Sequence, residues 1–271
     1  DKPVISIWGV GFERRNYTLE NVKVLIDFFK NDPQYGGCSV LLGVPPAWRT
    51  LARDATSNPT LLELIKSADI VHPWTPGRYK DIKMADNYKR DFTIADKQWC
   101  DQNNLLYMPV VFPGFSWSNL KNNPSLFNQI PRLKGDFLWR QFYNNTAAGA
   151  ETMYVAMFDE VDEGTAMFKI TDTKAKLPIQ ANDRLVSLDV DGVNLPSDWY
   201  LKLADQTQKM LDGTIPLTSV IPISPSAVTA AGNGSQFVTQ QNVPIVMGFS
   251  QKSTVNVTLK NIGSTTWTKA S

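Results

Sequence analysis

Four acidic side chains crowd into the stretch "FDEVDEGT", residues 158–165. Like charges this close together repel one another, so a purely structural segment normally avoids the arrangement. Paired carboxyl groups are what cleavage of a glycosidic bond needs, because one protonates the leaving oxygen and the other acts on the sugar ring. Two other interpretations stay open from the residues alone, a solvated acidic turn and a Ca²⁺ site formed by Asp159, Asp162 and their neighbours.

Within this stretch, Glu160 and Glu163 are three positions apart. On a continuing strand their side chains would face opposite sides, whereas in a helical turn they share one face. Gly164 and the change of pattern around 160–163 predict such a turn. The two Cβ atoms would then lie about 5–6 Å apart, close to the ~5–5.5 Å between carboxyl groups in retaining glycosidases. Two carboxylates this close split their pKa values, which keeps one of them protonated near neutrality.

The acidic stretch ends the last of five apolar runs, each of strand length and each followed by a segment with helical spacing. We therefore expect a parallel sheet with both faces covered. The expected strands are 3–10, 38–45, 68–74, 105–114 and 152–160, and the expected helices are 18–31, 58–67, 91–104, 135–150 and 196–211. Thr18 is the expected N-cap of the first helix.

Every expected strand ends in a segment rich in Gly, Pro, Trp, Arg or acidic residues, as in "WGVGF", "GVPPAWR", "HPWTPGRY", "FPGFSW" and "FDEVDEGT". This asymmetry favours an α/β fold of the (β/α)8 TIM-barrel type, whose active site is built from loops at the C-terminal ends of the strands. A doubly wound sheet is the alternative, with its ligand loops at one switch point. A closed barrel needs eight βα units and this chain carries about five, so either three units are missing from its front or the sheet is open.

The same strand ends carry the residues that we expect to bind a substrate beside the catalytic pair Glu160 and Glu163. The expected substrate-binding residues are Trp48, Arg49, His72, Trp74, Arg78, Tyr79 and Trp117. Among them, Trp74 and Tyr79 offer rings for stacking on pyranose faces, and Arg78 offers a guanidinium for a hydroxyl group or a carboxylate.

Two residues at strand ends, His72 and Trp8, can also be interpreted as structural residues. His72 is either a satisfied structural residue or, at a barrel mouth, a residue that binds sugar hydroxyls. Trp8 ends the first strand, and we expect it to pack in the core.

The composition excludes several classes of protein. A net charge of +1 gives no sign of a nucleic-acid surface, and no apolar run approaches the roughly 20 residues of a membrane span. Because the chain has a single histidine, His72, and two cysteines, most zinc sites are excluded and any Ser-His-Asp triad would depend on His72. There is no glycine-rich phosphate loop, and we expect neither a metal nor a cofactor.

The cysteines, the sequons and the first residue of the chain are the features that bear on its cellular compartment. Cys38 and Cys100 form either one disulfide or two buried thiols, and both are expected near the N-terminal face of the barrel. Four sequons fit a secreted or extracellular protein; they are at Asn16, Asn144, Asn233 and Asn256. The chain begins at Asp1 rather than at a methionine, so we expect its start to be either processed or a fragment boundary.

The pattern changes after about residue 216. The segment "IPLTSVIPISPSA" is rich in Pro and Ser and is expected to be a linker, and the residues after it alternate apolar and polar side chains with breaks at Gly and Asn. We therefore expect a (β/α)-barrel catalytic domain at 1–215, followed at 216–271 by a linker and a partial all-β Ig-like module with too few strands for a complete sandwich.

The acidic stretch resembles the signature W-N-E-W-x-E-G-T of the endo-α-mannosidases of glycoside hydrolase family 99. Glu160, Glu163, Gly164 and Thr165 match it, whereas Phe158, Asp159, Val161 and Asp162 replace the tryptophans and their neighbours. The blocks "GVPPAWRT", "VHPWTPGRY", "PVVFPGFSWSNL" and "IPRLKGDFLWRQF" are similar to those of bacterial and fungal proteins related to families 71 and 99, many of them labelled xylosidase/arabinosidase. The resemblance extends from Asp1 to about Met210, roughly three quarters of the chain.

The resemblance implies a (β/α)8 barrel in which the five strands of this chain are the fourth to the eighth. It implies that Glu160 acts as a base on the sugar 2-hydroxyl and that Glu163 is the acid/base. The segment "VTLKNIGSTTWT" also resembles the opening of an Ig-like module found beside such enzymes.

The leading hypothesis is therefore a secreted glycoside hydrolase that acts on an α-linked polysaccharide or glycan through the glutamate pair, with retention of configuration. One rival is a non-catalytic carbohydrate-binding or scaffold protein derived from such a barrel. The other rival is a metal-dependent hydrolase that uses the four acids, and EDTA would abolish the activity of this enzyme alone.

Overall fold

A computed structural model describes residues 2–178, 184–225, 235–242, 251–261 and 265–268. It divides the chain into two compact units, Asp1–Pro225 and Ser226–Ser271. The first unit contains all the residues expected to bind or cleave a substrate.

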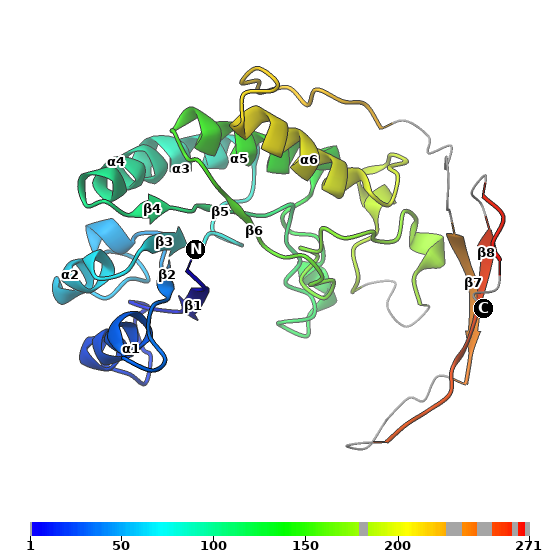
Figure 1. Cartoon of the computed structure of the whole chain (residues 1–271). Coiled ribbons are helices and arrows are strands. Elements are labelled where there is room, and N and C mark those ends of the chain that lie inside the picture. The colour runs from blue at the N-terminus through cyan, green and yellow to red at the C-terminus, as the bar shows by residue number, and fades with distance from the viewer. Residues whose placement is uncertain (1, 179–183, 226–234, 243–250, 262–264, 269–271) are drawn as a thin grey trace. The chain divides into compact units, whose positions relative to one another are not determined.

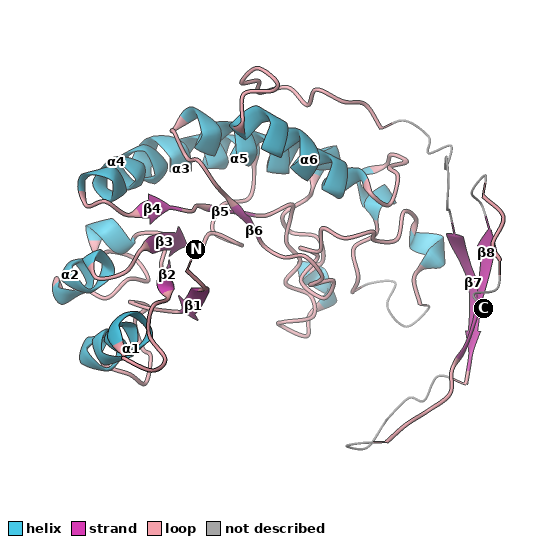
Figure 2. Cartoon of the chain, in the orientation of Figure 1, coloured by secondary structure: helices cyan, strands magenta, loops and turns pink. Residues whose placement is uncertain are grey.

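The first unit has an α/β fold with a parallel sheet, as the sequence predicted. Its strands are β1 (Val4–Trp8), β2 (Ser39–Val44), β3 (Ile70–Pro73), β4 (Leu106–Tyr107), β5 (Val110–Val111) and β6 (Tyr154–Val155). Its α-helices are α1 (Leu19–Asn31), α2 (Thr60–Lys66), α3 (Ile82–Tyr88), α4 (Ile94–Gln102), α5 (Asp136–Ala147) and α6 (Trp199–Leu211). Figures 1 and 2 show the helices along the outside of a curved layer whose inner side is formed by the strands.

The strands pair in parallel in the order β1-β2-β3-β4, and β5 pairs in parallel with β6. Because β4 and β5 follow each other directly, the stretch 106–111 contacts β3 on one side and β6 on the other. Two backbone hydrogen bonds at the centre of this stretch extend the pairing on both sides: Met108 N donates to Val71 O at 2.9 Å, and Tyr154 N donates to Pro109 O at 3.0 Å. Among the described residues, no pairing joins β6 back to β1, so the sheet is an open arc there.

Two apolar clusters hold the helices on the sheet. Alternate side chains of β2 (Val40, Leu42 and Val44) pack with Ile26 of α1 and Leu61 of α2, and all of these are buried. The second cluster joins Val111 to the buried faces of α5 and α6. Because these contacts occupy the outer face of the sheet, the inner face is left to carry the other half of each strand's side chains.

The helices begin where local chemistry predicts, with one exception. Thr18 caps α1, its side chain accepting a hydrogen bond from Asn21 N at 3.2 Å, as expected. The helix expected at 91–104 begins earlier instead, at Ile82, where the Asp81 side chain accepts from Met84 N at 2.8 Å. It continues through the π-helical turn Lys89–Thr93 into α4.

Three other expectations can be compared with the structure. Cys38 and Cys100 are separate, buried thiols, so the disulfide alternative is not the one present. The sequon at Asn144 is buried and its Nδ2 donates to Asp86 Oδ1 at 2.9 Å, so a glycan at that position would break the fold. Within the described part of the chain, none of the helices is long and apolar enough to cross a membrane.

The second unit contains an antiparallel pair of strands, β7 (Ser235–Gln241) and β8 (Asn256–Asn261), with an irregularity between Phe237 and Thr239. This agrees with the antiparallel β character expected there. The linker and Ig-like assignment stays a prediction, because 226–234, 243–250, 262–264 and 269–271 lie outside the described residues.

Candidate functional site

The acidic stretch is a tight turn, separated from β6 by two residues. Gly164 N donates to Val161 O at 3.1 Å, and both the amide and the hydroxyl of Thr165 donate to Glu160 O, at 3.1 and 3.2 Å. The chain therefore curls between Glu160 and Glu163 as the sequence predicted, instead of continuing as a strand.

Gly164 makes this turn possible. It has φ +67°, in the left-handed region that residues with a Cβ rarely adopt. An added Cβ would also lie 2.9 Å from Val186 Cγ2, which is too close for carbon atoms. The glycine of the motif is thus required twice, by its backbone conformation and by the space around it.

The loop after β5 holds the turn from one side. Ser116 N donates to Glu163 O at 2.7 Å, and Asn119 Nδ2 donates to Asp162 O at 2.6 Å. Both residues belong to the "FPGFSWSNL" block, so a backbone amide and a side-chain amide of this block hold the backbone of a turn that is far away in sequence.

Arg132 holds the turn from the other side, and sequence reasoning missed it. Its Nη2 donates to Gly164 O at 2.9 Å and to Ala166 O at 2.8 Å, and its guanidinium stacks on the ring of Tyr200 of α6, 4.6 Å from the centroid. The side chain is buried, and this burial lowers the pKa of Arg132. Arg132 lies within the block "IPRLKGDFLWRQF", but its partners are backbone carbonyls, so the block does not indicate this role. A Cβ added at Gly114 would lie 2.8 Å from Arg132 Cγ.

The electrostatics of the turn distinguish its two glutamates. Burial first, and then the charges of Glu160 and Asp162, raise the pKa of Glu163 from 4.5 to about 7. Burial, followed by the charges of Asp162 and Asp159, also raises the pKa of Glu160. A carboxyl group with a pKa near 7 is half protonated at neutral pH, which suits it to donate a proton. Glu160 lies near enough for its charge to be felt by Glu163.

The loop after β5 also contacts the loop after β3. Trp117, half-buried, packs against that loop, where a Cβ added at Gly77 would lie 2.8 Å from Trp117 Cζ2. Trp74, at the end of β3, contacts Trp8 at the end of β1 with ring centroids 5.4 Å apart. That these residues line one substrate site with the glutamates stays a prediction.

His72 lies on the inner face of β3 between aromatic rings. Its imidazole is 4% exposed, with its centroid 4.8 Å from the ring of Tyr154 and 6.1 Å from that of Trp74. Burial lowers the pKa of His72 to about 4, so the ring is neutral at physiological pH. Its Nδ1 is buried and has no hydrogen-bond partner.

Four of the residues expected at the site have structural partners instead. Trp48 and Tyr79 are 0% and 4% exposed, which corrects the expectation that they offer rings to a ligand. Trp48 packs edge-on against Trp99 of α4, and the Tyr79 hydroxyl donates to Gln141 Oε1 at 3.0 Å.

The two arginines of the expected site form ion pairs. Arg49 Nε lies 2.7 Å from Oδ1 of Asp96, which is 1% exposed, so this arginine joins the turn after β2 to α4. Arg78 Nη2 lies 2.6 Å from Asp54 Oδ2 at a more exposed position. Neither arrangement points to a substrate contact.

Trp8 was expected in the core, and the structure corrects this: its side chain is 48% exposed. Ile7, its neighbour, packs on the core cluster, so the alternation of side chains along β1 turns Trp8 toward the inner face. Tyr154, 36% exposed on the inner face of β6, was likewise not singled out from the sequence.

The described part of the chain contains no group of three or more His, Cys, Asp or Glu side chains placed to hold a metal ion.

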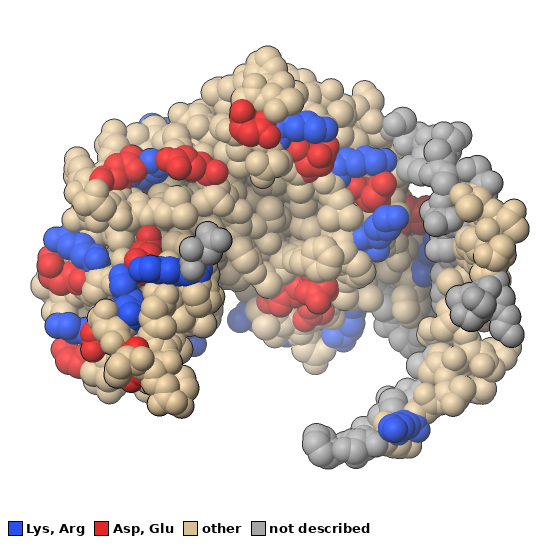
Figure 3. Space-filling model, in the orientation of Figure 1, with Lys and Arg blue, Asp and Glu red and all other residues tan. Residues whose placement is uncertain are grey.

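Figure 3 shows positive and negative side chains interspersed over the visible face, without an extended region of one sign.

Comparison with known proteins gives a distant structural likeness. Neither a protein-family model nor a curated protein matches the chain. Two solved structures of the GH99 endo-α-mannosidase from Bacteroides thetaiotaomicron, the first in complex with Bis-Tris propane, are similar to it with TM-scores of 0.47 and 0.44 and identities of 16% and 15%. Each alignment covers 78% of this chain, and they cover 69% and 64% of the two mannosidase chains. The likeness concerns the α/β fold with its parallel sheet.

Proposed function

We propose that the chain is a secreted glycoside hydrolase of the (β/α)-barrel type that cleaves an α-linked polysaccharide or glycan with Glu160 and Glu163. The observation that carries the proposal is the turn at 160–165. It places two carboxyl groups within electrostatic reach of each other and raises the pKa of Glu163 to about 7.

The motif resemblance assigns a role to each glutamate, and the charges of the turn support it. Glu160 removes the proton from the sugar 2-hydroxyl, whose oxygen displaces the leaving group at C1. Glu163 donates its proton to the departing glycosidic oxygen. Water then attacks C1 and gives a proton to Glu163, the bond between C1 and O2 breaks, and Glu160 returns its proton to O2; two displacements at C1 give net retention.

This mechanism sets a pH dependence. Glu163 must be protonated for the first step, so the rate on substrates with poor leaving groups falls as pH rises through about 7. The rate also falls at low pH, because Glu160 must be ionised to act as a base.

Hydrolysis of a panel of α-linked oligosaccharides by the full chain tests the proposal. We expect cleavage by the wild type, loss of cleavage in the Glu160→Gln/Glu163→Gln double variant, and the same anomer in the first product as in the substrate, followed by NMR. Activity that EDTA abolishes would favour the metal-dependent rival instead.

The non-catalytic rival is tested by the same panel. A chain that binds the oligosaccharides without cleaving any of them, in the wild type as in the double variant, would be a carbohydrate-binding protein on the same fold.

A further inference from the structure

Trp8 is an exposed aromatic side chain that its neighbours nevertheless hold in place. Its ring lies over Gly43 of β2, where an added Cβ would come within 2.6 Å of Trp8 Cδ1. Trp74 and Phe12 contact it with centroids 5.4 and 5.6 Å away, and the guanidinium of Arg15 lies 5.4 Å from its centroid. A large ring that is fixed on several sides and still 48% exposed is a preorganised surface for stacking.

Trp8 also begins a row of rings along the inner face of the sheet. The row continues through Trp74 and His72 to Tyr154, with the centroid distances given above. The Tyr154 hydroxyl lies 3.6 Å from the sulfur of Met157, which precedes the acidic turn directly. The row of rings thus runs from the end of β1 to β6, and its last contact is with Met157, three residues before Glu160.

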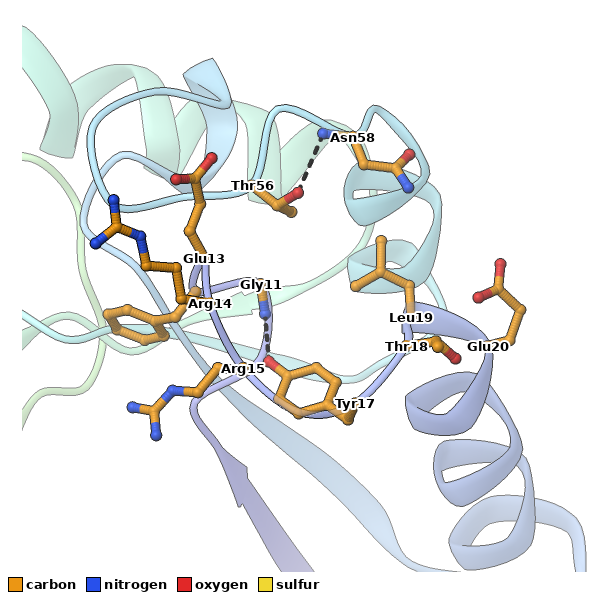
Figure 4. Close-up of a pocket in the computed structure, with 11 residues that line it drawn as sticks. Gly11, Glu13, Arg14, Arg15, Tyr17, Thr18, Leu19, Glu20, Thr56 and Asn58 are labelled. Carbon is orange, nitrogen blue, oxygen red and sulfur yellow. Dashed lines mark hydrogen bonds between the residues drawn. The ribbon is translucent and has the colours of Figure 1, made fainter.

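A polar cavity of about 380 Å³ lies at the loop between β1 and α1, and two of its lining residues, Phe12 and Arg15, also contact the ring of Trp8. Figure 4 shows its charged side chains on different sides of the space, with Glu13 and Arg14 on one and Glu20 on the other. Thr56 and Asn58 add a hydroxyl and an amide to the lining. The cavity therefore offers donors and acceptors together, and charges of both signs.

The loop that forms the cavity is fixed by its own hydrogen bonds. The Tyr17 hydroxyl donates to Gly9 O and accepts from Gly11 N at 3.0 Å. Glu13 N donates to Asp54 O at 3.0 Å, which ties the loop to the segment before α2. Gly9 and Gly11 have φ of +92° and +81°, and Arg14, a residue with a side chain, has φ +60°. The positive φ is unstrained at the two glycines, whereas at Arg14 it is a strained conformation that the hydrogen bonds of the loop must hold.

We propose that Trp8 and this cavity form a second carbohydrate-binding subsite, which stacks one neutral pyranose ring on Trp8 and binds its hydroxyls in the cavity. The inference rests on the proposed function in that it takes the ring to belong to the same α-linked glycan. It adds that the chain recognises this glycan at a distance from the bond it cleaves.

The chemistry of the lining favours a neutral sugar over other ligands. An anion would meet Glu13 and Glu20 together with the two arginines, and a cation would meet Arg14 and Arg15. A hydroxyl-rich ring can use donors and acceptors at once, while its C–H face covers an aromatic surface. A covering protein segment would leave these polar groups to be satisfied by its own side chains, and it is the alternative that the experiment must detect.

The test measures binding in the full chain carrying Glu163→Gln, so that no cleavage is needed for a result. The probes are α-linked tetrasaccharides of glucose and of mannose, titrated by calorimetry and by saturation-transfer NMR. We expect binding of at least one probe, a loss of at least about tenfold in affinity for Trp8→Ala, and a smaller loss for Trp8→Phe. Trp267→Ala, a matched change at a 43% exposed tryptophan of the second unit, should leave the affinity unchanged.

Glu13→Gln and Arg15→Met test the polar cavity without removing the ring, and each should weaken binding by a few-fold. Thermal unfolding of every variant confirms that the fold is kept. The proposal is overturned if no probe binds, or if both Trp8→Ala and Trp8→Phe bind the probes as tightly as the parent chain, which carries Glu163→Gln alone. A change of oligomeric state in Trp8→Ala without any sugar binding would assign the surface to a protein contact. A wild type that binds through Trp8 but hydrolyses nothing would refute the proposed function and leave this inference standing.

Discussion

Replacing Glu163 by glutamine should stabilise the protein at alkaline pH and change its stability little at acidic pH. The folded chain raises the pKa of Glu163 from 4.5 to about 7, with burial as the main cause. A carboxyl group with a raised pKa stabilises the folded state below its unfolded pKa, and that contribution is lost as the pH rises through the folded value. Between pH 5 and pH 8 the wild type must therefore lose stability at this site, and Glu163→Gln, which stays neutral, must not.

The size of the effect follows from the shift. A change of about 2.5 pKa units corresponds to roughly 3.4 kcal/mol at 1.36 kcal/mol per unit. Glu163 is only partly buried, so solvent screens much of this interaction, and we expect about 1 kcal/mol. Glu160 contributes part of the shift, so Glu160→Gln should lower the pKa of Glu163 and reduce the effect.

Urea unfolding at pH 5 and pH 8 measures this directly, with Glu151→Gln as the control because Glu151 is exposed before β6. The difference in unfolding free energy between Glu163→Gln and the wild type should be about 1 kcal/mol larger at pH 8 than at pH 5. A difference that does not depend on pH, or one of the opposite sign, would refute the assignment of a raised pKa to this carboxyl group.

Three further predictions concern the neighbours of the site. The imidazole of His72, the one histidine of the sequence, should titrate in NMR spectra with a pKa of about 4, and a value near 6.5 would show that it is not buried between the rings. Arg49→Met should destabilise the fold by about 2 kcal/mol, because it leaves the buried Asp96 unpaired. Adding Asp96→Asn to this variant should recover part of the lost stability. If Arg49→Met instead kept full stability but bound substrate more weakly, Arg49 would be a binding residue. Arg132→Met should cost about 2–3 kcal/mol because two carbonyls lose their donor, and it should lower kcat more than it raises KM; an effect on stability alone would show that Arg132 does not position the turn.

The parallel sheet and its helices could be predicted because their patterns are local. The strands are continuous apolar runs, and Thr18 caps α1 through a side chain that the sequence displays. The start of α3 was missed because "DIKMADNYKR" has few apolar residues, and the cap at Asp81 is visible only once the helix is known.

The turn with its two glutamates could also be predicted, since Gly164 signals a left-handed residue at the required place. The orientations of the tryptophans and arginines expected around the glutamates could not be predicted. Trp8 ends β1 and its side chain, which faces the inner side of the sheet, is 48% exposed, whereas Trp48, four residues after β2, is buried against Trp99 of α4. Which way a side chain points beyond the end of a strand depends on tertiary packing, and Arg132 shows the same limit because it binds backbone carbonyls that carry no sequence signal.

The central claim is that Glu163 donates the proton and Glu160 activates the sugar. It is tested most directly by comparing kcat/KM of the two glutamine variants on a pair of α-glycosides, one with an unactivated sugar leaving group and one with a dinitrophenyl leaving group. We expect Glu163→Gln to lose about 10²–10⁴-fold on the first substrate and little on the second, whereas Glu160→Gln should lose a comparable factor on both. Equal losses of Glu163→Gln on the two substrates, or full activity in either variant, would contradict it.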